Sequence, residues 1–169
     1  MRKIIRFIDS TSKYSGKTVS WLCVILVLEL AYEVTLRYVF DAPTNWSLEV
    51  SIMLGCSIIV LGWAYVHWQD GHVRVDLFYT HLSPRGKAII NVIGTSLFLF
   101  PLIIALSYAA TTWMWSAWEA NEKMAQSNWL PPAGPIKTVV VLGLLLFFLQ
   151  AGAKLFRDLY MLIRNNPYD

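Results

Sequence analysis

Three long stretches without a charged residue constrain this chain more than any other feature of its sequence. They are Val50–Trp68 with 19 residues, Ala88–Trp118 with 31 and Thr138–Ala153 with 16. A helix rises about 1.5 Å per residue and a bilayer hydrocarbon core is about 30 Å thick, so runs of this kind can cross a membrane. Charged residues make up 15% of the chain, against about 25% in soluble domains. The sequence therefore predicts an integral membrane protein and excludes secreted, disordered and nucleic-acid-binding classes.

The apolar runs predict an all-α fold with four transmembrane helices in one membrane domain, residues 1–169. The first span is anomalous because its longest charge-free stretch is only Thr18–Leu28. Its basic start fits a signal peptide, but two glutamates and the lack of a small-residue cleavage site favour an uncleaved helix. The third run is longer than a perpendicular crossing requires, so its helix is expected to tilt, project beyond the membrane or bend near Pro101. The expected spans are residues 18–40, 48–69, 84–116 and 136–162.

Basic residues are distributed unevenly among the segments that connect these spans. If the N-terminus is cytoplasmic, eleven of the fourteen basic residues lie on the inner side, and only Arg37, Lys123 and Lys137 lie outside. Because cytoplasmic segments carry an excess of Lys and Arg, this bias predicts four crossings with both termini in the cytoplasm. Membrane lipids are therefore an expected partner.

The connections contain further predicted features. Residues 72–82 place apolar side chains at helical spacing, which predicts a short amphipathic helix on the inner membrane surface, with Arg74 and Asp76 as its candidate functional residues. Ser83 and Pro84 are typical of the N-cap and first position of the third helix. Residues 119–135 form a long, proline-rich outer loop that we expect to be irregular and available to a partner.

Glu29, Glu33 and Arg37 follow one another at intervals of four residues and so share one face of the first helix. Counting about 1.5 Å per residue from Thr18 places Glu29 near the bilayer midplane, where a lone charge costs about 2.5–3.5 kcal/mol. Such residues carry protons or ions in some transporters, or they fix helix packing and dock a second subunit. We favour docking, because the third and fourth spans offer no acid or base to complete a relay. Two carboxylates one turn apart also repel each other, so we expect either that one is protonated or that both are bonded to Arg37, to other helices or to a partner protein. Of these partners, we expect the decisive one to lie outside the chain.

Trp46 and Glu49, at the start of the second span, complete the candidate partner interface. Glu49 falls in the first helical turn, where the positive end of the helix dipole favours an acid. The sequence has no phosphate-binding loop, no activated serine and no facing pair of histidines for a haem. Cys23 and Cys56 both lie within apolar spans and offer no metal-ligand spacing. We therefore expect a protein that is not an enzyme, without catalytic residues, metal or cofactor.

Several short motifs occur in a fixed order along the chain. Residues 37–49 read R-Y-V-F-D-A-P-T-N-W-S-L-E and resemble the signature R-x-V-F-x-x-P-x-x-W-x-x-E of the small membrane subunit (Q-type, DctQ-like) of tripartite ATP-independent periplasmic (TRAP) transporters. Many members carry a second acidic residue just before that glutamate, where this chain has Ser47 and Leu48. Further motifs similar to the family are G-W-A-Y at 62–65, G-H-V-R-V-D-L at 71–77, L-S-P-R at 82–85, A-N-E at 120–122, P-I-K at 135–137 and L-Q at 149–150.

The resemblance, which covers about residues 20–155, implies a scaffold subunit of a sodium-coupled secondary transporter in a bacterial inner membrane. A larger membrane subunit would hold the solute and sodium sites and move as an elevator. A soluble periplasmic substrate-binding protein would deliver an organic acid, and the small subunit would offer part of its docking surface. Sodium coupling is thus expected in the partner subunit.

Two other interpretations remain open from the residues alone. One is an autonomous, proton-coupled exporter of the small four-helix multidrug type, in which Glu29 would bind the cation and the proton. The greater length and the second glutamate of the first span weigh against it. The other is a haem or quinone anchor of a redox enzyme, which the missing histidine pair disfavours.

Overall fold

A computed structural model describes residues 2–69, 71 and 83–164 of the chain. These residues form helices joined by loops, with one isolated β-bridge between Lys123 and Pro132. The predicted surface helix at residues 72–82, with Arg74 and Asp76, lies outside the described residues. The helices are α1 (Arg2–Val39), α2 (Ser47–Trp68), α4 (Pro84–Gly94), the π-helical segment η1 (Thr95–Leu99), α5 (Phe100–Glu119) and α6 (Gly134–Arg164).

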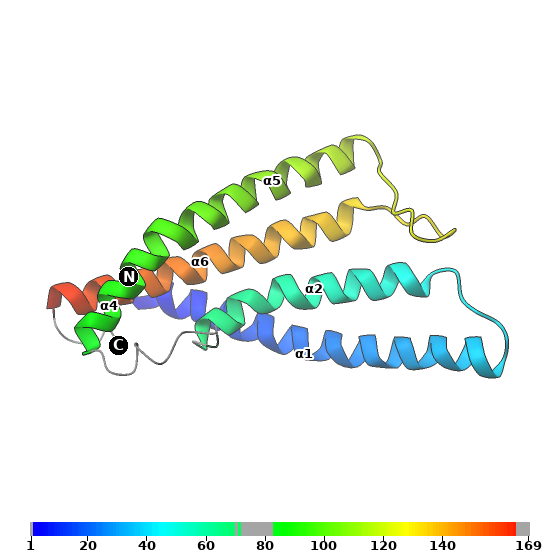
Figure 1. Cartoon of the computed structure of the whole chain (residues 1–169), viewed down its shortest axis with the longest axis horizontal. Coiled ribbons are helices and arrows are strands. Elements are labelled where there is room, and N and C mark those ends of the chain that lie inside the picture. The colour runs from blue at the N-terminus through cyan, green and yellow to red at the C-terminus, as the bar shows by residue number, and fades with distance from the viewer. Residues whose placement is uncertain (1, 70, 72–82, 165–169) are drawn as a thin grey trace.

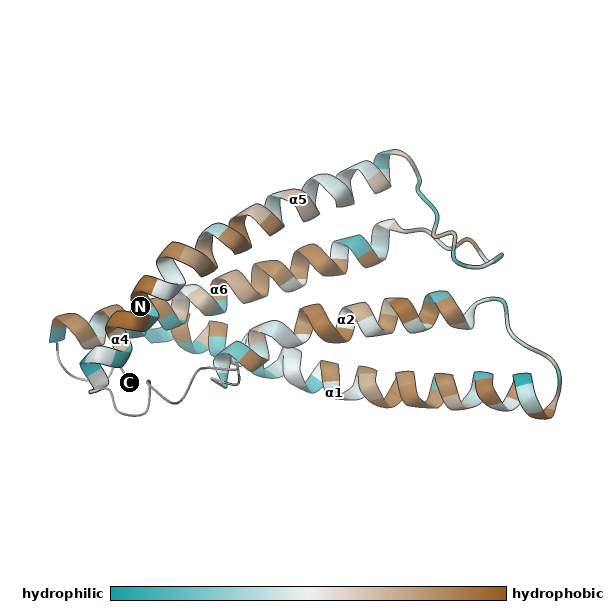
Figure 2. Cartoon of the chain, in the orientation of Figure 1, coloured by the Kyte–Doolittle hydropathy of each residue, from teal (hydrophilic) through white to brown (hydrophobic). Residues whose placement is uncertain are grey.

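The prediction of four transmembrane helices is confirmed. Four helical stretches in the described chain are long and apolar enough to cross a membrane: Arg2–Val39, Ser47–Trp68, Arg85–Glu119 and Gly134–Arg164. Hydrophobic residues dominate their lengths, whereas the loop between α1 and α2 and the loop between α5 and α6 are more hydrophilic (Figure 2). The all-α architecture therefore follows from the apolar runs.

The long helices lie in a row and do not form a closed bundle (Figure 1). α1 packs chiefly along α2, α2 packs along α6, and α6 packs along α5, while α1 also touches α6. The order in space is thus α1, α2, α6, α5. Such a row leaves both of its broad faces open, and most large apolar side chains of α1 and α5 are exposed there.

α1 and α2 run antiparallel in a fixed register. The Ser15 hydroxyl donates a hydrogen bond to the Leu61 carbonyl at 2.5 Å, and the Ser47 hydroxyl donates to the Glu29 carboxylate. Fourteen residues separate these two contacts on each helix, so the two helices have the same register at both contacts. α1 begins well before the expected span, and its residues 30–39 extend past the first residue of α2 (Figure 1).

The third long helix changes its hydrogen-bond pattern next to the proline that the sequence singled out. The π-helical segment η1 ends two residues before Pro101. Proline lacks an amide donor and clashes with the preceding turn, so a regular α-helix loses one hydrogen bond there. The predicted N-cap is confirmed, since the Ser83 hydroxyl accepts a hydrogen bond from the Gly86 amide at 3.2 Å.

Charge divides the molecule into two ends. At one end lie the starts of α1 and α4 and the ends of α2 and α6; we call it the basic end, and the opposite one the acidic end (Figure 1). Among the described residues, the basic end has ten basic side chains and two acidic ones, Asp9 and Asp158. The basic ones are Arg2, Lys3, Arg6, Lys13, Lys17, Arg85, Lys87, Lys154, Arg157 and Arg164.

At the basic end a polar chain joins α1 to α6. Ser12 donates to the Gln150 side-chain oxygen at 2.8 Å, and the Gln150 amide donates to Asp9 at 3.1 Å. Asp9 also forms an ion pair with Arg157. Because Ser12 and Gln150 are each 1% exposed, these hydrogen bonds satisfy groups that water does not reach.

The seam between α2 and α6 depends on Gly143. A Cβ atom at this position would lie 2.8 Å from the Val60 carbonyl oxygen, so only glycine lets the two backbones approach this closely. Val60 and Leu144 are buried beside it. Close backbone approach, and not a large side-chain core, therefore holds the centre of the row together.

We expect Gly143→Ala to destabilise the protein by about 1–3 kcal/mol, because the added methyl group meets backbone atoms that cannot rotate away. Gly55→Ala is the matched control, since no atom lies within 4 Å of its added Cβ. Thermal unfolding of both purified full-length variants in one detergent measures the difference. Equal unfolding temperatures would show that the α2–α6 seam can adjust.

Candidate functional site

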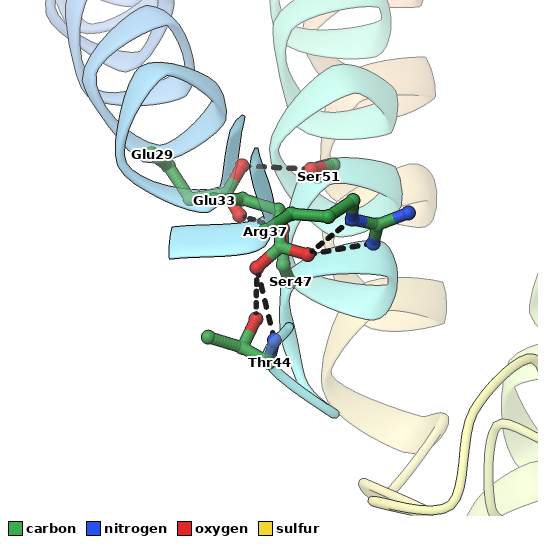
Figure 3. Close-up of polar contacts among 6 residues, drawn as sticks. All are labelled: Glu29, Glu33, Arg37, Thr44, Ser47 and Ser51. Carbon is green, nitrogen blue, oxygen red and sulfur yellow. Dashed lines mark hydrogen bonds and ion pairs between the residues drawn. The ribbon is translucent and has the colours of Figure 1, made fainter. Parts of the chain in front are cut away.

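Glu33 is the most completely bonded carboxylate of the candidate site. Its Oε1 accepts hydrogen bonds from Arg37 Nε at 3.1 Å and from a terminal Arg37 nitrogen at 2.6 Å. Its Oε2 accepts from the Thr44 amide at 3.2 Å and from the Thr44 hydroxyl at 2.5 Å (Figure 3). Glu33 is 6% exposed. The ladder predicted from the four-residue spacing therefore forms, and the turn after α1 completes it.

The local sequence explains why Thr44 reaches Glu33. Asp41 has a left-handed backbone, with φ of 50°, which aspartate tolerates better than most residues. The Ala42 amide then bonds to the Leu36 carbonyl at 3.1 Å, which turns the chain back toward α1. The Glu33–Thr44 contact thus fixes the sharp connection between α1 and α2.

Glu29 lies one turn below, bound to the beginning of α2. The Ser47 hydroxyl donates to its Oε1 and the Ser51 hydroxyl donates to its Oε2 at 2.7 Å (Figure 3). Because Ser47 is the first residue of α2, Glu29 lies level with the start of that helix.

Glu49, which was predicted in the first turn of α2, is indeed there and is 0% exposed. Its Oε1 accepts a hydrogen bond from the Ser127 amide at 2.5 Å. No donor among the described residues reaches its Oε2, which is also buried. Glu49 thus ties α2 to the middle of the loop between α5 and α6, a link across 78 residues of sequence.

That loop is more ordered than the sequence suggested. The Met124 amide bonds to the Pro131 carbonyl and the Ala133 amide bonds to the Glu122 carbonyl, both at 2.8 Å. Lys137, only 3% exposed, forms an ion pair with Glu122 and lies 4.2 Å from the centre of the Trp113 ring. The loop, α5 and α6 are therefore joined around one buried ammonium group.

Trp46 also makes a contact within the chain. Its ring stacks on Tyr32 of α1, with centroids 6.3 Å apart. Trp46 is still 36% exposed and the Arg37 side chain 53% exposed, whereas Glu33 and Glu49 are buried. Of the five candidate interface residues, Arg37 and Trp46 thus remain the most accessible to another protein.

Of the alternatives for Glu29 and Glu33, bonding to Arg37 and to another helix is the one observed. The expectation that their decisive donors lie outside the chain is wrong. Glu29, Glu33 and Glu49 all accept hydrogen bonds from residues of this chain. Apart from Arg37, their donors are hydroxyls and amides of the turn after α1, the start of α2 and a distant loop, which helical spacing cannot reveal. No sequence pattern pointed to Ser127 as a partner, whereas the buried Gln150 and Lys137 lie in segments that resemble the family.

The arrangement can hold elements of the chain together. In the described part of the chain, no group of three or more His, Cys, Asp or Glu residues could bind a metal ion. Three grooves of about 270–380 Å³ have mainly apolar linings: one between α1, α5 and α6, one between α2, α5 and α6, and one between α5 and α6. The bonded carboxylates lie outside these grooves.

We expect Glu49→Leu to loosen the loop at residues 124–130, because it removes the acceptor of the Ser127 amide. A hydrogen bond to a charged group contributes about 1.5–3 kcal/mol, so amide hydrogen exchange there should accelerate about tenfold or more. Glu119→Leu, an exposed acid at the end of α5, is the matched control. Unchanged exchange in Glu49→Leu would mean that the Lys137–Glu122 pair alone orders the loop.

The sequence of this chain matches a known protein family. Residues 26–160 match the model of the family described as tripartite ATP-independent periplasmic transporters, DctQ component. No curated protein matches the chain. The family match covers most of the chain, from the middle of α1 to near the end of α6, and so includes the carboxylate cluster, the loop and Lys137. The chain therefore belongs to the DctQ family, the small membrane component of TRAP transporters.

Proposed function

We propose that this protein is the stationary scaffold of a sodium-coupled TRAP transporter that imports an organic acid through a bacterial inner membrane. In this proposal a larger, elevator-type membrane subunit contains the solute and sodium sites. A periplasmic substrate-binding protein delivers the solute. The small subunit widens and steadies the non-moving part of the larger one.

The row of four helices carries this proposal. An autonomous transporter commonly encloses binding groups near the midplane, between helices that are broken or repeated. Here the described helices enclose no polar chamber, since they lie side by side and the described grooves are apolar. A flat row exposes a large area to a neighbour, which suits a supporting subunit.

The polar contacts support the proposal that this subunit is rigid. Glu29 bonds α1 to α2, and Glu33 bonds α1 to the turn before α2. Glu49 bonds α2 to the outer loop, and Lys137 bonds that loop to α6. Buried hydrogen-bond networks that are largely satisfied restrict motion, because each broken bond exposes an unpaired group. A scaffold that resists the movement of its partner needs such links.

The difference in charge between the two ends supports one orientation of the protein in the membrane. The excess of basic residues at one end favours a cytoplasmic position for it, together with both chain termini. The acidic end would then face the periplasm, with residues 30–39 of α1 and the ordered loop projecting there. Trp129 and Leu130 of that loop are exposed and are available to a docking protein.

The exporter alternative finds no support. Glu29 lies at the end of α2 between two serine hydroxyls, whereas a proton-coupled exporter needs its carboxylate in a central chamber. The matching family is a transporter component and not an enzyme family.

Reconstitution tests the proposal directly. Liposomes containing this chain alone should accumulate no solute, because the chain has no enclosed pathway. Liposomes that also contain the large subunit, with the binding protein added outside, should take up an organic acid in response to a sodium gradient. Proton-driven efflux by the chain alone would overturn the scaffold proposal.

The predicted interface is tested at its most exposed charge. We expect Arg37→Ala to weaken co-purification of the large subunit about tenfold or more, because a charged pair at an interface contributes about 1.5 kcal/mol or more. Lys123→Ala removes an exposed cation from the loop and serves as control. Glu33→Leu should act in the same direction by releasing Arg37. An intact complex with abolished uptake would assign these residues to coupling.

A further inference from the structure

One exposed stripe of α1 changes from basic to apolar side chains along its length. Its residues are Lys13, Lys17, Trp21, Val24 and Leu28, spaced four, four, three and four positions apart, which places them on one side of a helix. All five are exposed, including Trp21 at 69% and Leu28 at 64%. We call these residues the Lys13–Leu28 stripe. Along it, ammonium groups give way to an indole and then to aliphatic side chains.

The opposite side of the same stretch is fixed to the rest of the molecule. Ser12 bonds to Gln150 of α6, and Ser15 bonds to Leu61 of α2. Gly16 faces the Tyr65 ring so closely that a Cβ atom would lie 2.4 Å from it. These contacts hold α1 in one rotation about its axis, so the Lys13–Leu28 stripe is turned away from α2 and α6.

The length of the stripe corresponds to one leaflet of a bilayer. Eleven positions separate Lys17 from Leu28, about 16 Å at 1.5 Å per residue, close to half of a hydrocarbon core about 30 Å thick. In the register that the contact between Ser15 and Leu61 sets, Lys13 lies level with Trp63, at the start of the aromatic end of α2, and Lys17 lies about one turn farther along α1. Tryptophan and tyrosine are enriched at the level of lipid headgroups.

The positive charge of this region favours an anionic ligand. Ten of the twelve charged residues described at the basic end are cationic. Lys17 Nζ lies 5.6 Å from the centre of the Tyr14 ring, a cation–π contact that holds the ammonium group on the exposed side of α1. Basic residues at the membrane surface attract anionic lipids.

We propose that the Lys13–Leu28 stripe binds an anionic phospholipid. Lys13 and Lys17, one turn apart, hold its phosphate, and one acyl chain lies along Trp21, Val24 and Leu28. The order of headgroup, interface and chain in a phospholipid matches the order of side chains along the stripe. An acidic helix of a partner protein would satisfy the lysines but would gain nothing from this gradient. The inference depends on the membrane position of α1 and not on the proposed transport function.

Native mass spectrometry of the full-length chain, titrated with dioleoyl phosphatidylglycerol or dioleoyl phosphatidylcholine, tests the proposal. The unmodified protein should bind phosphatidylglycerol more tightly. The double variant Lys13→Gln/Lys17→Gln should lose about thirtyfold of that affinity, since a lysine near an anionic surface contributes about fivefold. The matched control is Lys3→Gln/Arg6→Gln, which removes the same charge from the same helix, farther from the hydrocarbon.

Two outcomes would overturn the site. If both double variants lose affinity equally, the attraction is a diffuse effect of net charge. If neither lipid is preferred and Lys13→Gln/Lys17→Gln instead releases the large subunit from the membrane complex, the stripe binds protein. Trp21→Ala gives a further check, because it should weaken binding of both lipids while the preference for phosphatidylglycerol persists.

Discussion

Carboxylates withdrawn from water require hydrogen-bond donors, and this requirement organises the acidic end of the molecule. Glu33 takes donors from Arg37 and from the turn at Thr44, Glu29 takes them from the first turns of α2, and Glu49 takes one from Ser127. An unpaired buried acceptor costs about 1–3 kcal/mol or more when charged. The need of these carboxylates for donors therefore positions the turn, the start of α2 and the outer loop. These elements can move only if the hydrogen bonds to the carboxylates break.

Between the two bonded ends, the helices associate by close backbone approach and not by a large enclosed core. Lipid tails are as apolar as leucine, so little hydrophobic gain comes from packing transmembrane helices together. Gly143 against Val60 supplies close packing, and the chain Ser12–Gln150–Asp9–Arg157 supplies polar links at the basic end. A row held at its ends and along its centre is stiff, and its open faces are suited to a larger subunit and to lipid.

The family match and the hydrogen bonds within the chain together indicate a structural role for the charged residues of the first span. Charges of this kind in a lone membrane chain suggest a proton or ion pathway. In a member of the DctQ family whose carboxylates are bonded to its own turn, helix and loop, they act as structural links. Arg37 and Trp46 are the residues that combine such a link with an exposed surface.

Much of this protein could be predicted from its sequence. Long apolar runs predict the four helices, because a backbone in lipid must satisfy its own hydrogen bonds, and local signals located the Ser83 cap, the Glu33–Arg37 ladder and the irregularity before Pro101. Only the tertiary structure decided the serine partners of Glu29, the partner of Glu49 and the order of the helices in the row. Those features depend on contacts between residues far apart in sequence, whose register is set by donors such as Ser47 and Ser127 that no periodicity marks.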